Sequence, residues 1–363
     1  MIIGIPKEIK DDEYRIALLP VGARLLTQNG HRVLIQSGAG QGSGFENSDY
    51  TAASAEIVDN AEAIYDQADL VAKVKEPQPS EIGQLRSGQI LFCYFHFAAS
   101  ETLTRGCLGA GITAIAYETL ESPDGLLPLL TPMSEVAGKM SIQEGAKYLE
   151  RPMMGRGILL GGVTGVAPAN VLILGGGVVG TNAARTAAGL GANVTLMDVD
   201  LNRLRYLDEI LPANVTAIYS DPHAVEKYGQ LADLVVGSVL LPGALAPKLI
   251  PRSLLSRMQP GSVIVDVCID QGGCTETSRP TTHHDPTYMV DGIVHYCVAN
   301  MPGAVGRTSS QALCNATLPY LHQLAALGDE AFAQQSPGHA LAINMKNGTL
   351  TNQAVAQAFD SNL

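Results

Sequence analysis

The sequence has little that would suit a membrane or a nucleic acid. It has no tryptophan among 363 residues, and only 16% of the residues are charged. No stretch reaches the roughly 18 uninterrupted apolar residues of a membrane helix, and the N-terminal MIIGIPKEIKDDEYR lacks the apolar core of a secretory signal. Runs of lysine and arginine are absent, and the formal net charge is -12, which disfavours a nucleic-acid partner. We therefore predict a cytoplasmic protein that binds neither membranes nor nucleic acid.

Cysteine is also sparse and lacks any C-x-x-C spacing. Most of the six cysteines lie in apolar runs, which favours reduced core residues over disulfides or metal ligands. They are Cys93, Cys107, Cys268, Cys274, Cys297 and Cys314.

What the chain does have is glycine, with 38 residues, and many short aliphatic runs between helical segments. The first half predicts strands at 2–5, 32–36, 70–74, 89–95 and 112–116, with helices such as 20–29, 60–67 and 100–110 between them. A second series predicts strands at 171–175, 194–198, 216–219, 234–238, 263–268 and 294–299. These strands lack polar alternation, so each series is typical of a parallel sheet with both faces buried.

Two long helical patterns lie at the junctions of these series. The first runs over about 134–149 with Ser134 as the expected N-cap, and the second over about 309–326. We predict an α/β protein of two domains joined by these helices, with a cleft between the domains. Residues 1-128 plus 308-363 would form one domain, and 129-307 would form the other, a doubly wound parallel sheet.

The strongest motif is VLILGGGVVGTNAARTAAGLGANVTLMDVD. It places Gly175, Gly177 and Gly180 in a G-x-G-x-x-G pattern between a predicted strand and a predicted helix. The diphosphate of a dinucleotide would bind at the start of this helix, beside Val178 and Val179. The next strand ends in Asp198, a carboxylate suited to the ribose hydroxyls and repulsive to a 2′-phosphate. This favours NAD over NADP, although Arg203 and Arg205 lie nearby; a glycine-rich structural turn is the alternative.

Ligands of open α/β sheets bind outside the carboxyl ends of the strands. In the second domain, the candidates at these ends are Ser220, Val239, Leu240, Val267, Ile269, Asp270, Val298, Asn300 and Met301. Asp270 and Asn300 are the polar groups that follow apolar strands most conspicuously.

The same rule points to Lys75 and His96 in the first domain, which follow LVAKV and QILFCYF. A core histidine and a surface lysine are the alternatives, and Lys73 competes with Lys75. Arg15 is either part of a surface ion pair or a ligand for a carboxylate. A small carboxylate that loses hydride would need cations, an acid/base group and a nicotinamide, and these residues could supply the first two.

These segments together resemble the alanine dehydrogenase family. The resemblance covers almost the whole chain and is carried by GIPKEIKDDEYRIALLP, FHFAAS, LGGGVVGTNAA, DQGG and CVANMP. It implies NAD-dependent, reversible oxidative deamination of L-alanine to pyruvate and ammonia, as in alanine catabolism. The implied molecule is a homo-oligomer, most often a hexamer.

The resemblance also implies roles for individual residues. His96 would be the general acid/base, and Asp270 would assist addition of water or ammonia. Arg15 and Lys75 would hold the substrate. Cofactor contacts would include Ser134, Arg203 and Arg279 as well as the residues named above. Some relatives carry metal ligands where this chain has Gln323 and Leu327, so we predict no metal site there.

Two other types of protein share this two-domain α/β architecture. The NAD-binding subunit of proton-translocating transhydrogenase would use the same fold as a hydride carrier, but has no need of His96 and Asp270. A saccharopine-type dehydrogenase would act on a larger amino acid. An NAD sensor without catalysis is a further alternative.

Overall fold

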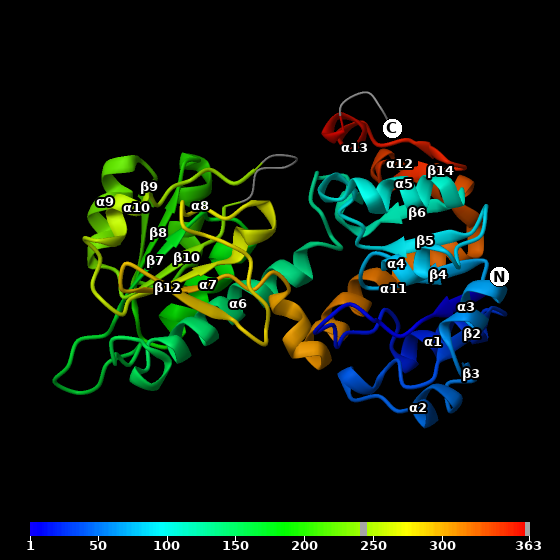
Figure 1. The fold of residues 1–363 in the computed structure, drawn as a ribbon, viewed down its shortest axis with the longest axis horizontal. Coiled ribbons are helices and arrows are strands. Elements are labelled where there is room, and N and C mark those ends of the chain that lie inside the picture. Colours follow the sequence, from blue (N-terminus) through cyan, green and yellow to red (C-terminus); the bar gives the residue numbers. More distant parts are fainter. Residues whose placement is uncertain (240–244, 360–363) are drawn as a thin grey trace. The chain divides into compact units, whose positions relative to one another are not determined.

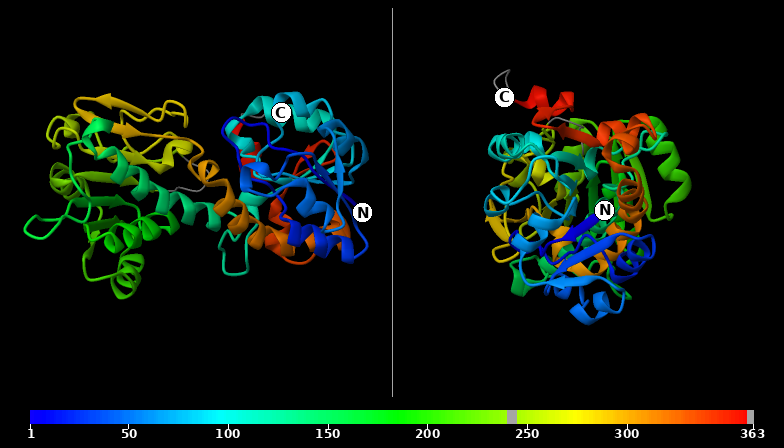
Figure 2. Two further views of the ribbon diagram at one scale, coloured as in Figure 1. Left: turned by 90° about the horizontal axis from the view of Figure 1, so that it is seen from below. Right: turned by 90° about the vertical axis from the view of Figure 1, so that its right-hand side faces the viewer.

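The computed structural model describes residues 1–239 and 245–359. The chain forms two compact units. Unit 1 comprises Met1–Met133 and Gly303–Leu363, and unit 2 comprises Ser134–Pro302. Figure 1 shows each unit as a sheet flanked by helices, and Figure 2 shows these layers from two further directions. The predicted architecture of two α/β sheets is confirmed.

Unit 1 is built on an eight-stranded sheet with the order β15-β14-β6-β5-β4-β1-β2-β3. The strands are β1 Ile2–Ile5, β2 Arg32–Gln36, β3 Glu56–Val58, β4 Leu70–Ala72, β5 Ile90–Cys93, β6 Thr113–Ala116, β14 Ile343–Lys346 and β15 Thr349–Leu350. The strands from β3 to β6 are parallel, and β14 pairs antiparallel with β6. The C-terminal segment thus forms an edge of this sheet.

The central strands of unit 1 are apolar because both faces of the sheet are covered. All residues of β4, β5 and β6 are buried. The assigned strands end earlier than predicted, at Ala72 and Cys93. Backbone bonds from Lys73 N to Phe92 O and from Tyr94 N to Val74 O continue the pairing a little further, and His96 then takes a left-handed backbone conformation. The helices of unit 1 are α1 Pro20–Gln28, α2 Asn47–Thr51, α3 Ala61–Gln67, α4 Pro79–Ile82, α5 Glu101–Ala110, α11 Gly306–Ala333, α12 Pro337–Ala342 and α13 Gln353–Ala358.

Unit 2 contains a seven-stranded sheet with the order β12-β13-β11-β10-β7-β8-β9. Its strands are β7 Asn170–Leu174, β8 Asn193–Asp198, β9 Val215–Tyr219, β10 Leu234–Gly237, β11 Val263–Asp266, β12 Thr287–Val290 and β13 Ile293–Tyr296. All neighbours are parallel except β12 and β13, which form an antiparallel pair that the sequence analysis did not predict. The helices α7 Val178–Gly189, α8 Leu201–Ile210, α9 Pro222–Leu231 and α10 Arg252–Leu255 belong to this unit.

The two long helices differ in detail from their predictions. Helix α6 covers Thr131–Tyr148 and crosses from unit 1 into unit 2, whereas α11 begins just after the chain has returned to unit 1. Ser134 is not an N-cap, because α6 already begins at Thr131. Helix α11 extends beyond the predicted end, and Gly328 interrupts it with a non-helical backbone. None of the helices in residues 1–239 and 245–359 is both long and apolar enough to cross a membrane.

Candidate functional site

The glycine motif of unit 2 forms the turn between β7 and α7. Gly175 has a φ of 102°, which a residue with a side chain rarely adopts. A Cβ on Gly180 would lie 1.8 Å from the carbonyl oxygen of Gly175, so the helix can pack against the turn only without a side chain there. A Cβ on Gly177 would meet nothing within 4 Å, so this side of the turn is open to a ligand. The geometry thus matches the role of each glycine in a dinucleotide-binding turn.

Asp198 lies at the end of β8 and its carboxylate reaches this turn. Its Oδ2 accepts a hydrogen bond of 2.7 Å from Gly176 N, and its Oδ1 accepts one of 2.9 Å from Asp200 N. Arg203 closes the far side, because its Nε donates to Gly176 O at 2.6 Å and its Nη2 to Thr181 Oγ1 at 2.9 Å. Asp198 and Arg203 therefore both bind the backbone of the same turn, and these hydrogen bonds of Arg203 stabilise the turn.

The strand-end candidates of unit 2 lie just beyond the strands, in loops and short 3-10 helices. Val267, Ile269 and Asp270 lie in a short 3-10 helix, Val267–Gln271, after β11; Ile269 is buried and Asp270 is exposed. Val298, Asn300 and Met301 follow β13. Ser220 N donates to Asp198 O at 2.9 Å, which places it beside the acid.

The other predicted cofactor contacts of unit 2 are scattered over different elements. Val178 and Val179 form the first turn of α7, Val239 is half-buried after β10, and Ser134 is half-buried on α6. Leu240 lies outside the described residues.

Arg279 is held by Tyr288 of β12. Its backbone N–H donates to the Tyr288 hydroxyl at 2.9 Å, and its guanidinium lies over the Tyr288 ring, 4.2 Å from the ring centroid. Sequence reasoning from the strand ends did not find this residue, because β12 itself was not predicted.

In unit 1, Arg15 is buried rather than part of a surface ion pair. The guanidinium makes a two-pronged contact with Glu13, in which Nε lies 2.6 Å from Oε1 and Nη2 lies 2.5 Å from Oε2. Its Nη1 also lies 3.1 Å from Met133 Sδ. Burial by itself lowers the pKa of Arg15, but Glu13 outweighs burial and raises it. The cation is therefore permanent.

His96 is exposed and has an unusual backbone, with a φ of 52°. Glu118 holds this conformation: its carboxylate accepts hydrogen bonds from His96 N at 2.6 Å and from Phe95 N at 3.1 Å. The His96 ring stacks on the ring of Tyr94, with centroids 6.0 Å apart and planes inclined by 5°. Such strain is held where the surroundings enforce it, often at functional sites.

Tyr94 connects the histidine to the arginine. The positive charge of Arg15 acts on the Tyr94 hydroxyl and opposes the rise in the pKa of Tyr94 that burial causes. The hydroxyl donates to Leu129 O at 2.5 Å. Tyr94 thus stacks on the His96 ring and also senses the charge of Arg15.

The competition between Lys73 and Lys75 is decided by burial. Lys73 Nζ is enclosed between Glu81, at 2.9 Å, and Glu8, at 3.2 Å. Burial lowers the pKa of Lys73, but the two carboxylates outweigh this effect and raise it. Lys75 is half-buried two residues further along the chain. Lys73 is therefore a structural cation, and Lys75 remains the candidate for a ligand.

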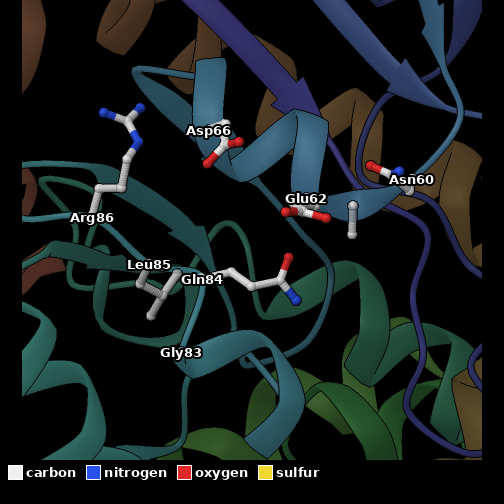
Figure 3. Close-up of a pocket in the computed structure, with 8 residues that line it drawn as sticks. Asn60, Glu62, Asp66, Gly83, Gln84, Leu85 and Arg86 are labelled. Atoms are coloured by element: carbon white, nitrogen blue, oxygen red, sulfur yellow. The ribbon is translucent and has the colours of Figure 1, made fainter.

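Two pockets of unit 1 differ in their relation to these residues. A cavity of about 430 Å³ is lined by residues 7–15 and by 38, 39, 41 and 42, so Arg15 and Glu13 belong to its wall. A larger pocket of about 690 Å³ lies between the start of α3 and the turn after α4. Figure 3 shows Glu62 and Gln84 on facing sides of this larger pocket. It includes none of the predicted catalytic or substrate-binding residues.

Sequence reasoning missed Glu13, Tyr94 and Glu118. Glu13 and Tyr94 lie two residues from Arg15 and His96, whereas Glu118 reaches His96 from 22 residues away, and no motif spacing singled them out. Gln323, on α11, lies 3.3 Å from the Nε2 of His339, and Leu327 is exposed. The predicted absence of a metal at these two positions stays a prediction.

The fold and these residues define a two-unit α/β protein whose second unit has the fold typical of dinucleotide-binding domains. Comparison with known families matches residues 4–137 to the alanine dehydrogenase/PNT N-terminal domain and residues 141–353 to the alanine dehydrogenase/PNT C-terminal domain. The chain therefore belongs to the alanine dehydrogenase/PNT family, and it is an enzyme of the dehydrogenase class.

Individual relatives agree with the family assignment. An alanine dehydrogenase from Halomonas elongata is 55% identical, covering 99% of this chain and 97% of the relative, and one from Methanococcus maripaludis is 52% identical with the same coverage. A solved L-alanine dehydrogenase structure aligns with a TM-score of 0.95 at 50% identity and covers 99% of both chains. A transhydrogenase from Sinorhizobium meliloti, 24% identical with a TM-score of 0.82 over 98% of this chain and all of the other, shares the fold.

Proposed function

We propose that this protein catalyses the reversible, NAD-dependent oxidative deamination of L-alanine. Alanine, NAD⁺ and water would give pyruvate, ammonium, NADH and a proton. The names of the curated relatives support the substrate. The observation that carries the proposal within this chain is His96, an exposed histidine whose strained backbone is held by Glu118 and whose ring stacks on Tyr94.

Unit 2 would hold the dinucleotide. The open face of Gly177 fits a diphosphate approaching the N-terminus of α7, and the carboxylate of Asp198 fits the adenosine ribose. Bound NAD would accept the hydride from the alanine Cα. The negative charge of Asp198 would disfavour a 2′-phosphate and so favour NAD over NADP.

Unit 1 would hold the amino acid. The charge of Arg15 is permanent and buried, and a charged hydrogen bond to a carboxylate contributes roughly 1.5–3 kcal/mol in such surroundings. Lys75 would add a second cation, against the carboxylate or the carbonyl of pyruvate. These two residues would orient the substrate before the reaction.

His96 would move the protons. It would accept a proton from the water that adds to the imine carbon and return one as the amine leaves. Asp270, exposed on the turn after β11, would assist this addition. The chain would act as a homo-oligomer, most often a hexamer in this family, which sedimentation velocity of the purified protein would test.

The direct test is NADH formation from L-alanine and NAD at alkaline pH, with NADP and other amino acids in parallel. General acid–base groups contribute about 10²- to 10⁴-fold to turnover, so we expect a loss of that size in His96→Ala. The exposed His223 of α9 offers a control, because His223→Ala removes an imidazole that has no assigned role in the reaction. Binding of NAD without oxidation of any amino acid would reject the proposal and favour a hydride carrier or a sensor.

A further inference from the structure

Two cysteines and an aspartate meet under the turn that carries Asp270. One carboxylate oxygen of Asp266 and the sulfurs of Cys268 and Cys274 all lie within 4.8 Å of one another, and all three residues are buried. Cys268 Sγ is 3.0 Å from Asp266 Oδ1. Asp266 ends β11, Cys268 lies in the following 3-10 helix, and Cys274 follows that helix. Three potential metal ligands thus come from one short loop.

The charge of this cluster calls for a cation. Asp266 has no solvent-exposed surface, yet across residues 1–239 and 245–359 no lysine, arginine or histidine forms an ion pair with it. Within the described part of the chain, its carboxylate accepts hydrogen bonds from three donors without charge: Cys274 N at 2.9 Å, Ser278 Oγ at 2.5 Å and the Cys268 thiol. Buried charges in proteins are usually paired with an opposite charge or coordinate a metal.

The spacing of the cluster suits a small, thiophilic cation. Zinc takes sulfur at about 2.3 Å and carboxylate oxygen at about 2.0–2.2 Å, so two tetrahedral ligand atoms lie roughly 3.6 Å apart. The Cys268 sulfur and the Asp266 oxygen would therefore separate by roughly half an ångström. Ser278 Oγ, beside the other carboxylate oxygen, or a water would complete four ligands.

Glycines keep this position compact. A Cβ on Gly237 would lie 2.3 Å from Cys274 Sγ and 3.0 Å from Asp266 Oδ1, and one on Gly273 would lie 2.6 Å from Asp266 Oδ2. The backbone of β10 and of the turn therefore approaches the three ligands directly.

We propose that Asp266, Cys268 and Cys274 form a binding site for a soft divalent cation of the zinc or cadmium class. On binding, the two thiols lose their protons to solvent, two metal–sulfur bonds and one metal–oxygen bond form, and no electron is transferred. For these two cysteines, this replaces the expectation that they only fill the core. None of the three ligands is assigned a role in the proposed dehydrogenase reaction, and Cys268 lies in the same 3-10 helix as Asp270.

The test is a titration of the reduced, full-length protein with Cd²⁺, followed by the ultraviolet charge-transfer band of cadmium–thiolate bonds. We expect one cadmium per chain, and displacement of cadmium by Zn²⁺. Cys268→Ala and Cys274→Ala should each abolish or strongly weaken the band, and Asp266→Asn should weaken binding while keeping a side chain of the same shape. A count of six reactive thiols in denaturant ensures that the cysteines start reduced.

Cys107→Ala is the matched control, because it removes a buried thiol of α5 that lies in unit 1. It should leave the cadmium band unchanged. A thermal melt of each variant without metal shows whether it is folded. Absence of the band in the folded, reduced wild type would overturn the site, and so would a band that persists in both folded single-cysteine variants.

Discussion

The contact between Glu118 and the backbone of His96 leads to a quantitative prediction. The left-handed conformation costs a residue other than glycine about 1–2 kcal/mol relative to the right-handed one. The carboxylate of Glu118 offsets this cost with two hydrogen bonds, to His96 N and Phe95 N. A hydrogen bond to a charged group contributes about 1.5–3 kcal/mol, so the pair is sufficient to enforce the conformation.

Glu118→Ala should therefore release the loop. Without the carboxylate, the left-handed form of His96 would be disfavoured by the intrinsic 1–2 kcal/mol, which is about a 5- to 30-fold loss of the competent population. We expect kcat/KM for L-alanine to fall by that factor. Glu118→Gln keeps one oxygen acceptor and should retain more activity than Glu118→Ala.

Steady-state kinetics across pH would separate positioning from chemistry. If Glu118 only positions His96, the rate falls by the same factor at every pH while the inflection of the profile stays in place. The exposed Glu101, paired with Arg105, provides the control Glu101→Gln. Full kcat/KM in a folded Glu118→Ala protein would show that the carboxylate does not hold a catalytic conformation.

Five further substitutions test the two units separately. Gly180→Ala places a Cβ 1.8 Å from a backbone carbonyl oxygen, so it should lower the free energy of unfolding by about 1–3 kcal/mol in chemical denaturation. It should also weaken NADH binding, measured by fluorescence. In Gly177→Ala the new Cβ meets nothing within 4 Å, so this variant should weaken NADH binding and leave stability unchanged. Lys73→Met leaves two buried carboxylates without their cation and should destabilise the protein by about 3–5 kcal/mol in urea. Lys75→Met should lower activity and leave stability nearly unchanged. Equal stability losses in the two variants would contradict the assignment of Lys73 as the structural cation and Lys75 as the substrate ligand. Asp198→Ala removes a charged hydrogen-bond acceptor that contributes about 1.5–3 kcal/mol. The ratio of kcat/KM with NAD to kcat/KM with NADP should therefore fall about tenfold to a hundredfold. An unchanged ratio would mean that another group selects the cofactor.

The dinucleotide turn was predictable because its requirements are local. A strand, a tight turn and a helix start follow one another within a few residues, and each glycine answers a steric need inside that segment. The same holds for the apolar strands β4, β5 and β6, whose composition follows from burial on both faces. The predicted ends of the strands were less accurate, because the apolar sequence continues past the last residue that the strand includes.

The residues around the predicted active groups were not predictable in this way. Arg15 follows a run of charged residues, and only packing against Met133 and pairing with Glu13 make it a buried cation. Lys73 and Lys75 both end the same apolar run, and the positions of Glu8 and Glu81 distinguish them.

The sequence by itself determined the two α/β sheets, the dinucleotide turn and the candidates His96, Lys75 and Asp270, because these depend on local pattern and on the rule that ligands meet strand ends. Tertiary structure alone decided which charges are buried, that Glu118 holds His96, and that Cys268 and Cys274 meet Asp266. Such contacts depend on where the fold places side chains from different segments and loops. Burial then determines how strongly each charged group interacts with its neighbours.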